Sequence, residues 1–338
     1  AALVGGWCRL CSGLPLVYSG HNTMADELPS YQFLRPRALA VGLARFLDAC
    51  VPRLGDRCLP HSANMDQFFR GRGLGARTEA IVPFGIDVDW ASQGDGRAVR
   101  QHYCPGPGPV LLYTGVLDEF QRLDLLLEAL RTVAGSHAGV KLLVAVTIPQ
   151  AGHLARLVQR ARDLGVTEQL VITAPQPLAA IRDFLAACDV AVVPRPQAPG
   201  FPIKLLNYLA AARPCVLFAS SASNGLVHGE NVFLAAPDSA EALAGGILEV
   251  LRDGDLRQRL AGNAARFVCA HHDRRVIAGQ VCAVYRRTLA ATGGRKPRAW
   301  RPVSPKTIPS LAPTWVTELP RNTEEAEMLA ALACATGP

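Results

Sequence analysis

Short apolar runs alternate with amphipathic segments between residue 110 and about residue 286. Continuous apolar runs are typical of buried parallel strands, and apolar residues at a spacing of three or four are typical of helices that cover such strands. We predict strands at residues 110–113, 140–146, 170–173, 190–193, 215–218 and 232–234. We predict helices at residues 121–133, 152–164, 177–187, 203–212 and 240–252.

This alternation predicts an α/β domain with a parallel sheet covered on both faces. Gly115, Thr147, Ala174 and Pro194 each follow a predicted strand. Because parallel strands end at the same edge of a sheet, the loops at these positions should share the carboxyl edge. Ligands bind at that edge in open α/β sheets.

The first hundred residues show the pattern more sparsely. We predict strands at residues 16–19, 57–60 and 80–83, and helices at residues 1–12, 36–51 and 63–71. A doubly wound domain commonly needs about 100–150 residues, so this portion is predicted to be incomplete. Residues 83–90 are interpreted as a turn into an interdomain linker, and residues 105–109 as the end of that linker.

The predicted organisation has four parts. Residues 1–104 form a partial Rossmann-like domain and residues 105–273 a second Rossmann-like domain, which faces the first across a cleft. Residues 274–292 form a last helix that packs back toward the first domain, and residues 293–338 form a flexible tail. The tail is rich in proline and lacks periodicity, apart from a short helical pattern at residues 324–335.

Composition narrows the class of protein. Hydrophobic residues make up 49% of the 338 residues and charged residues 19%, so the chain can bury a sizeable core. No apolar stretch reaches the ~18 residues that cross a bilayer, and the first residues lack a secretion-signal pattern. We therefore expect a cytoplasmic protein. Only 6% of residues are aromatic and no nucleic-acid-binding module is recognised, so a nucleic-acid partner is not expected.

The net charge of +7 comes in part from a basic cluster near the C-terminus. The cluster consists of Arg295, Lys296, Arg298, Arg301 and Lys306. One interpretation is a solvated tail. The other is peripheral contact with an anionic membrane at its inner face, where each basic residue contributes up to about 1 kcal/mol.

The ten cysteines do not form a metal-binding pattern. Cys8 and Cys11 have C-x-x-C spacing, but no second pair answers them. Cys188, Cys215 and Cys282 lie in apolar segments and are expected to be buried, reduced thiols, as is usual in a reducing compartment. No structural zinc is predicted.

Two other polar pairs invite a functional interpretation. Asp87 and Asp89 form a D-V-D pattern, but they follow Gly85 in the linker rather than a ligand loop, so metal binding is not expected. His271 and His272 lie where one helix gives way to the last, and are expected at the surface.

The segment from residue 189 to residue 216 carries the clearest chemical signal. An apolar strand ends in a Pro- and Gly-rich loop, and Pro202 is predicted as the first residue of the following helix. The amides of Ile203, Lys204 and Leu205 would lack partners within the helix. A helix start at a strand's carboxyl end, with Lys204 in its first turn, favours an anion, typically a phosphate. The alternative is an ordinary strand–loop–helix unit with a solvated lysine.

Several motifs, in this order, resemble those of a known family. They are VYSGHNTMADELPSY at residues 17–31, IVPFGID at 81–87, VLLYTGVLDEFQRLDLLLEAL at 110–130, GFPIKLLNYLAAARPCV at 200–216, and LVHGENVFLAAPDSAEALAGGILEVLRD at 226–253. Together they resemble retaining glycosyltransferases of family 4 (group 1), which have the GT-B fold. Phe84 stands where asparagine is usual in the second motif.

The resemblance implies a donor that is a nucleotide-diphosphate sugar, bound mainly by the second domain. Its diphosphate would meet the loop at Gly115 and the helix start at residues 200–204. Val116 and Gln121 stand where the family often has arginine and lysine, and Arg122 stands where glycine is usual. Arg122, Arg195 and Lys204 are candidates to supply the missing positive charge. The implied donor-binding residues are Gly115, Gln121, Arg122, Arg195, Gly200, Phe201, Pro202, Ile203, Lys204 and Asn207.

The resemblance also implies residues near the transferred sugar. Pro199 and Asn207 occupy the positions of two family glutamates, and Asn207 could still contact the ribose through its amide. His21 matches a histidine that faces the donor sugar and the acceptor, so His21 and Lys204 are the candidate catalytic residues. The leaving phosphate would take the proton of the attacking hydroxyl, and no metal or other cofactor is implied. Alternatively, His21 caps a strand end.

The resulting expectation is a glycosyltransferase that moves a sugar to a hydroxyl acceptor with retention. The acceptor would be lipid-linked or a saccharide, in cell-envelope polysaccharide or glycolipid assembly. Two alternatives remain open: a degenerate or truncated homologue that binds a nucleotide sugar or a partner protein without transfer, and a sugar-nucleotide epimerase of the same fold.

Overall fold

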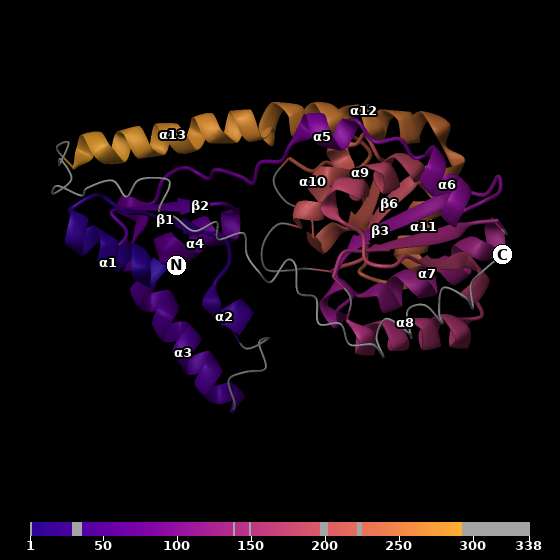
Figure 1. The fold of residues 1–338 in the computed structure, drawn as a ribbon, viewed down its shortest axis with the longest axis horizontal. Coiled ribbons are helices and arrows are strands. Elements are labelled where there is room, and N and C mark those ends of the chain that lie inside the picture. Colours follow the sequence, from indigo (N-terminus) through magenta and orange to yellow (C-terminus); the bar gives the residue numbers. More distant parts are fainter. Residues whose placement is uncertain are drawn as a thin grey trace, which may run out of the picture.

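The computed structural model describes residues 2–28, 36–137, 139–148, 150–196, 202–221 and 225–292. The chain forms a smaller lobe from its beginning and a larger lobe built around a parallel sheet (Figure 1). The last two helices, α12 (Gly254–His271) and α13 (Arg274–Ala291), run one after the other along one side of both lobes (Figure 1).

The larger lobe contains a six-stranded, wholly parallel sheet. Its strands are β3 (Val110–Gly115), β4 (Lys141–Val146), β5 (Leu170–Ile172), β6 (Val190–Val193), β7 (Cys215–Phe218) and β8 (Phe233–Ala235). The spatial order is β5-β4-β3-β6-β7-β8, so the direction of winding reverses between β3 and β6. This is the topological switch point at which open α/β sheets form their ligand crevice.

Helices cover both faces of this sheet because side chains along each strand point alternately to either side. Leu111 and Tyr113 belong to the apolar core on one face, and Val110 and Leu112 to the core on the other. The first face is covered by α7 (Leu123–Ser136), α8 (Ala151–Leu164) and α11 (Ala240–Arg252). The second is covered by α9 (Leu178–Ala187), α10 (Ile203–Ala210) and part of α12.

The smaller lobe has a two-stranded parallel sheet among the described residues. It pairs β1 (Val17–Gly20) with β2 (Arg57–Pro60), and Gly20 lies opposite Pro60. Four helices accompany it: α1 (Ala2–Ser12), α2 (Met24–Glu27), α3 (Arg37–Cys50) and α4 (Ala63–Gly71). A small core of Met65, Phe69, Cys58 and Leu74 holds α4 against β2.

The strand predicted at residues 80–83 is absent from the structure. This segment runs beside β2, where the Glu79 amide donates to the Cys58 carbonyl (2.9 Å) and the Val82 amide to the Pro60 carbonyl (3.0 Å). The two donors are three residues apart whereas their acceptors are two apart, so the regular ladder of a parallel strand does not form. The segment is therefore extended but is not a strand of the sheet.

The predicted boundary at residue 104 does not match the packing. The segment that was interpreted as an interdomain linker contains two short helices, α5 (Val88–Ser92) and α6 (Arg97–Tyr103). Val88, Ala91 and Cys104 are buried in the core of the larger lobe. The sequence concealed these helices because each is short and buries only a few side chains.

The chain crosses between the lobes twice, and the two crossing segments lie side by side. The Ile86 amide donates to the His272 carbonyl (2.9 Å), and the Arg274 amide donates to the Ile86 carbonyl (2.9 Å). Nδ1 of the His272 ring also lies 2.8 Å from the Phe84 carbonyl oxygen. His272 is buried, which lowers the pKa of its ring, so its predicted surface position is wrong. His271 is exposed, as predicted.

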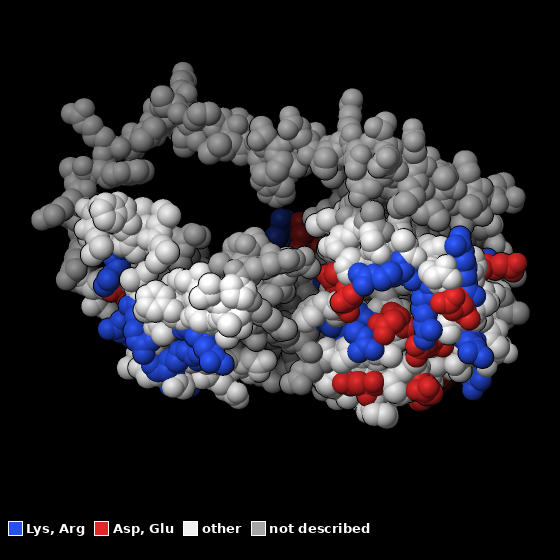
Figure 2. All heavy atoms as spheres, turned by 90° about the horizontal axis from the view of Figure 1, so that it is seen from below, with Lys and Arg blue, Asp and Glu red and all other residues white. Residues whose placement is uncertain are grey.

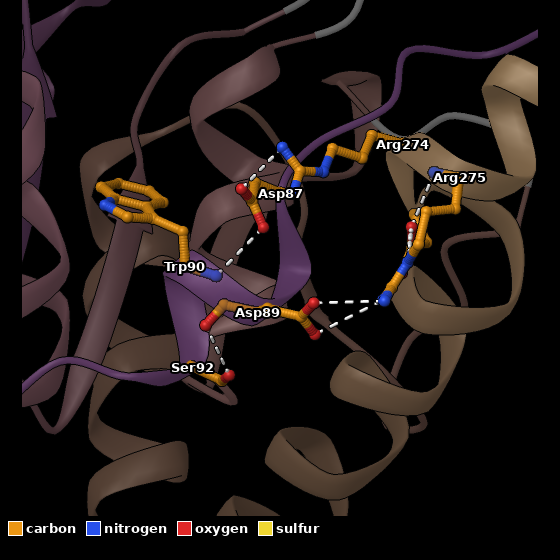
Figure 3. A network of polar contacts seen from close by, with 7 residues as sticks. Asp87, Asp89, Trp90, Ser92, Arg274 and Arg275 are labelled. Atoms are coloured by element: carbon orange, nitrogen blue, oxygen red, sulfur yellow. Dashed lines mark hydrogen bonds and ion pairs between the residues drawn. The ribbon is translucent and has the colours of Figure 1, made fainter.

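Charged residues reinforce this crossing (Figure 3). Arg274 pairs with Asp87 (3.0 Å), and Arg275 pairs with Asp89 (3.2 Å). Asp87 also caps α5, since its side chain accepts from the Trp90 amide (3.1 Å). The two carboxylates of the D-V-D pattern thus bind arginines that begin α13.

Beyond the crossing, α13 packs against the smaller lobe. Its Ile277 and Val284 form an apolar cluster with Leu59 of β2 and with Val82. The core of the smaller lobe therefore includes residues from both ends of the described chain.

The two lobes differ in surface character on the face shown in Figure 2. On the larger lobe basic and acidic side chains are interspersed. Ion pairs of the larger lobe include Arg160–Glu128 (2.5 Å). The smaller lobe shows a group of basic side chains beside a broad uncharged area. Exposed apolar side chains of α1 and α3 include Trp7, Leu39 and Phe46.

Cysteine burial follows the predicted pattern only in part. Cys188 and Cys215 are buried in the larger lobe, as expected. Cys282 is exposed because it lies on the side of α13 that faces away from the smaller lobe's core. No helix in the described ranges is both long and apolar enough to cross a bilayer. The predicted tail at residues 293–338 lies outside the described residues.

Candidate functional site

The site lies at the switch point, where β3 and β6 separate. These strands pair only at Leu111↔Val190 and Leu112↔Ala191. Beyond that point the Thr114 amide donates instead to the phenol oxygen of Tyr208 in α10 (2.8 Å). Tyr208 is fully buried, and burial raises the pKa of its phenol, which therefore stays protonated. The hydrogen bond ties α10 to the end of β3.

Lys204, in the first turn of α10, reaches across to the loop that follows β3. Its ammonium donates to the Tyr113 hydroxyl (2.8 Å) and to Gln121 Oε1 (2.9 Å). The Tyr113 hydroxyl in turn donates to the Val116 carbonyl (2.8 Å). The structure thus brings together Lys204 and Gln121, two of the predicted residues, through a tyrosine that the sequence did not single out.

Gly115 provides the space in which the ammonium sits. Its φ of +132° is a conformation that side chains rarely adopt. A Cβ atom there would also lie 2.8 Å from Lys204 Nζ. Glycine is therefore required at this position, both for the turn and for the close approach of Lys204.

The site carries positive charge that the protein only partly balances. Burial, and then the nearby Arg195, lowers the pKa of Lys204 to about 7, and Asp118 opposes this shift. Burial also lowers the pKa of Arg195 to about 10, and its guanidinium lies 4.2 Å from the centroid of the Phe120 ring. Two cations in a low-dielectric setting with one nearby carboxylate are suited to an anionic ligand.

Arg122 does not join this group. Its side chain forms an ion pair with Asp124 (2.8 Å) at the exposed start of α7. Its backbone is left-handed, with φ 52° and ψ 43°, as the residue that precedes the helix. The need for a positive φ explains why glycine would suit this position.

The start of α10 differs slightly from the prediction. Pro202 precedes the helix in an extended conformation and is not its first residue. Ile203 is exposed, and Asn207, three residues after Lys204, is partly buried. Gly200 and Phe201, together with Pro199, lie outside the described residues.

His21 lies on the smaller lobe, directly after β1. Its ring contacts the rings of His61 (centroids 4.6 Å apart) and Phe84 (5.2 Å). Ser19 Oγ lies 2.6 Å from His61 Nε2 and 3.4 Å from His21 Nε2. The contacts that His21 makes in the described part of the chain all come from the smaller lobe and the crossing.

Sequence reasoning missed His61, Tyr113, Asp118 and Tyr208. The two tyrosines follow the apolar pattern of a strand and a helix, so their polar tips were not apparent. His61 could have been found, because it follows β2 just as His21 follows β1, and parallel strands end at one edge. No group of three or more His, Cys, Asp or Glu side chains suited to a metal ion occurs among the described residues.

Known proteins resemble this chain in both sequence and fold. Residues 108–253 match the family model of the glycosyl transferases group 1. A D-inositol 3-phosphate glycosyltransferase of Acidothermus cellulolyticus is 28% identical over 218 residues, which cover 62% of this chain and 48% of the relative. A protein of the same name from Rhodococcus erythropolis is 26% identical over 273 residues, 78% of this chain and 60% of the relative. The chain thus spans about half the length of the curated relatives it matches.

Solved structures show the same fold. HepE of Anabaena in complex with UDP superposes with a TM-score of 0.69 at 19% identity, over 85% of this chain and 76% of HepE. Sucrose-phosphate synthase of Thermosynechococcus elongatus superposes with a TM-score of 0.70 at 20% identity, over 86% of this chain and 72% of the synthase. The expectation of an α/β, GT-B architecture is confirmed. Residues 108–253, which lie in the larger lobe, thus match the model of the glycosyl transferases group 1, and the chain as a whole shares the fold of its GT-B neighbours.

Proposed function

We propose that this protein transfers a sugar from a nucleotide-diphosphate sugar to a hydroxyl acceptor, with the diphosphate seated against Lys204. The observation that carries the proposal is the ammonium of Lys204, held beside Gly115 at the switch point with Arg195 as a second cation. A pKa of about 7 means that burial disfavours the charged lysine in the protein alone. A bound diphosphate would supply the negative charge that restores it.

The choice of donor is supported by structural neighbours. HepE of Anabaena has been crystallised with UDP, with UDP and glucose, and with UDP-glucose. The fold it shares with this chain supports a nucleoside diphosphate at the corresponding edge of the sheet. UDP and UDP-glucose are therefore the first probes to use here.

The chemistry follows from where charge develops. The bond between the anomeric carbon and the phosphate oxygen breaks, and its electrons stay on the departing diphosphate. Lys204, Arg195 and the first amides of α10 would stabilise that charge, and each such contact contributes about 2–4 kcal/mol to the transition state.

The departing phosphate would then take the proton of the attacking hydroxyl on the same face of the sugar, which gives retention. In this scheme His21 orients the donor sugar or the acceptor, and neither a metal nor another cofactor takes part. We further propose that the acceptor is lipid-linked or a saccharide. The protein would act in cell-envelope polysaccharide or glycolipid assembly in the cytoplasm, where its basic tail could contact the inner membrane face.

The test uses the two lysines in the described part of the chain. Lys204→Met should lower the affinity for UDP at about pH 6.5 by roughly 10- to 100-fold, the effect of losing a charge-assisted hydrogen bond. Lys141→Met is the matched control, because Lys141 begins β4 at the opposite edge of the sheet and donates to the Glu168 carbonyl. Titration calorimetry measures both affinities.

Equal affinities in the two variants would overturn the proposed site. Turnover of a panel of nucleotide sugars, followed by release of the nucleoside diphosphate, tests the transferase itself. Binding that depends on Lys204, but without turnover of any donor and acceptor pair, would instead support the non-catalytic homologue. The replaced family positions Val116 and Asn207 favour that second candidate.

A further inference from the structure

Two histidines and a serine meet at the carboxyl edge of the smaller lobe's sheet. Gly20 ends β1 opposite Pro60, which ends β2, so His21 and His61 directly follow the two strands side by side. Phe84 stacks on the His61 ring (centroids 5.0 Å apart) and contacts the His21 ring at a tilt (centroids 5.2 Å apart). These contacts restrain the ring planes, and the hydrogen bonds determine where the protons lie.

The protonation of His61 follows from its partner. His61 Nδ1 lies 2.6 Å from the Val82 carbonyl, which can only accept a hydrogen bond. Nδ1 must therefore carry a proton. Burial, and then the nearby His21, lowers the pKa of His61, although its bond to Val82 opposes the shift. The ring is then neutral, and Nε2 bears a lone pair.

Ser19 links the protonation of His61 to that of His21, because its hydroxyl contacts both rings. Its Oγ lies 2.6 Å from His61 Nε2, and the single hydroxyl proton is needed to satisfy that lone pair. Toward His21 Nε2, at 3.4 Å, the same oxygen can only accept. The neutral ring of His21 therefore carries its proton on Nε2.

We propose that Ser19 and His61 hold His21 as its Nε2–H tautomer, so that Nδ1 of His21 remains free to accept a hydrogen bond. Both are positioning residues that act through His21. The contacts of His21 in the described part of the chain use Nε2 and the ring faces, not Nδ1. The inference that Nδ1 of His21 accepts a hydrogen bond from a hydroxyl of the sugar or of the acceptor rests on the proposed function. The assignment of the tautomer does not rest on it.

The tautomers can be read from long-range ¹H–¹⁵N correlation spectra of the full chain labelled with ¹⁵N-histidine. His21→Gln and His61→Gln assign the signals. We expect the proton of His61 on Nδ1 and that of His21 on Nε2. In Ser19→Ala the Nδ1 signal of His21 should move toward the averaged position of a histidine in an unstructured peptide, and Ser19→Thr should leave it in place. A proton on Nδ1 of His21 in the wild type, or an unchanged His21 in Ser19→Ala, would overturn the proposal.

Kinetics separates this proposal from the proposed function. If the protein is a transferase, Ser19→Ala should lower kcat by up to about tenfold, the effect of one lost hydrogen bond, at unchanged KM for the donor. Ser19→Thr should restore kcat. A wild-type protein that shows the expected tautomers but turns over no donor would refute the transferase and leave the tautomer assignment intact.

Discussion

At the scale of single residues, the site depends on the amine of Lys204, whose charged form is disfavoured by burial. Lys204 is surrounded by Tyr113, Gln121 and Gly115, and Arg195 lies close enough to lower its pKa. The sequence predicted Lys204 and Gly115 because a helix start after a strand and a glycine after a strand are recognisable patterns. It could not predict Tyr113, because an aromatic residue in an apolar run is indistinguishable from core.

This protonation state predicts proton uptake on ligand binding. At about pH 8 Lys204, with a pKa of about 7, is mostly neutral in the free protein. A diphosphate favours the charged form and raises that pKa, so binding of UDP-glucose should take up as much as one proton. Calorimetry in buffers of different ionisation enthalpy measures the uptake, which should vanish in Lys204→Met and persist in Lys141→Met. Equal uptake in both variants would contradict this assignment.

At the scale of secondary structure, the larger lobe was largely predictable and the smaller lobe less so. The strand positions of β2, β6 and β7 match the predicted ranges, because buried parallel strands leave short, continuous apolar runs. The predicted third strand of the smaller lobe does not form, because its hydrogen bonds to β2 slip by one residue between Glu79 and Val82, which an apolar pattern does not reveal. Helices α5 and α6 were missed because each contributes few side chains to the core.

The start of α7 offers a test at this scale. Arg122 adopts a left-handed conformation that costs a non-glycine residue roughly 1–2 kcal/mol. Its ion pair with Asp124 is exposed and contributes little. Arg122→Gly should therefore raise the free energy of unfolding by up to about 1 kcal/mol, whereas Arg131→Gly, at an exposed position within α7, should lower it by about 1 kcal/mol.

Urea denaturation measures both changes. Because Arg122 pairs with Asp124 and not with the groups around Lys204, we expect Arg122→Gly to bind UDP as tightly as the wild type. Measuring this affinity therefore also tests the predicted role of Arg122 in donor binding. A stability loss in Arg122→Gly as large as that in Arg131→Gly would show that the left-handed conformation carries no strain.

At the scale of the whole molecule, the lobes are connected by more than a linker. The chain crosses twice at Ile86 and His272, and α13 then completes the apolar core of the smaller lobe. The pattern of the sequence predicted the last helix but not its partners, since the contacts of Ile277 with Leu59 and Val82 join residues far apart in the chain.

Removing one of these contacts should loosen the smaller lobe selectively. Ile277, which is 9% exposed, packs on the smaller lobe, whereas its neighbour Val276 is 38% exposed. Ile277→Ala should cost about 2 kcal/mol or more, and Val276→Ala less than about 0.5 kcal/mol. Hydrogen exchange of β1 and β2, followed by mass spectrometry, should accelerate in Ile277→Ala only. Equal exchange in the two variants would show that α13 does not stabilise this sheet.

The bond between Tyr208 and the Thr114 amide has a consequence for how a ligand is received. It joins the helix that carries Lys204 to the strand that ends in Gly115, so the two cannot drift apart independently. The two elements therefore keep their relative position before any ligand arrives, and little reorganisation energy accompanies binding between them.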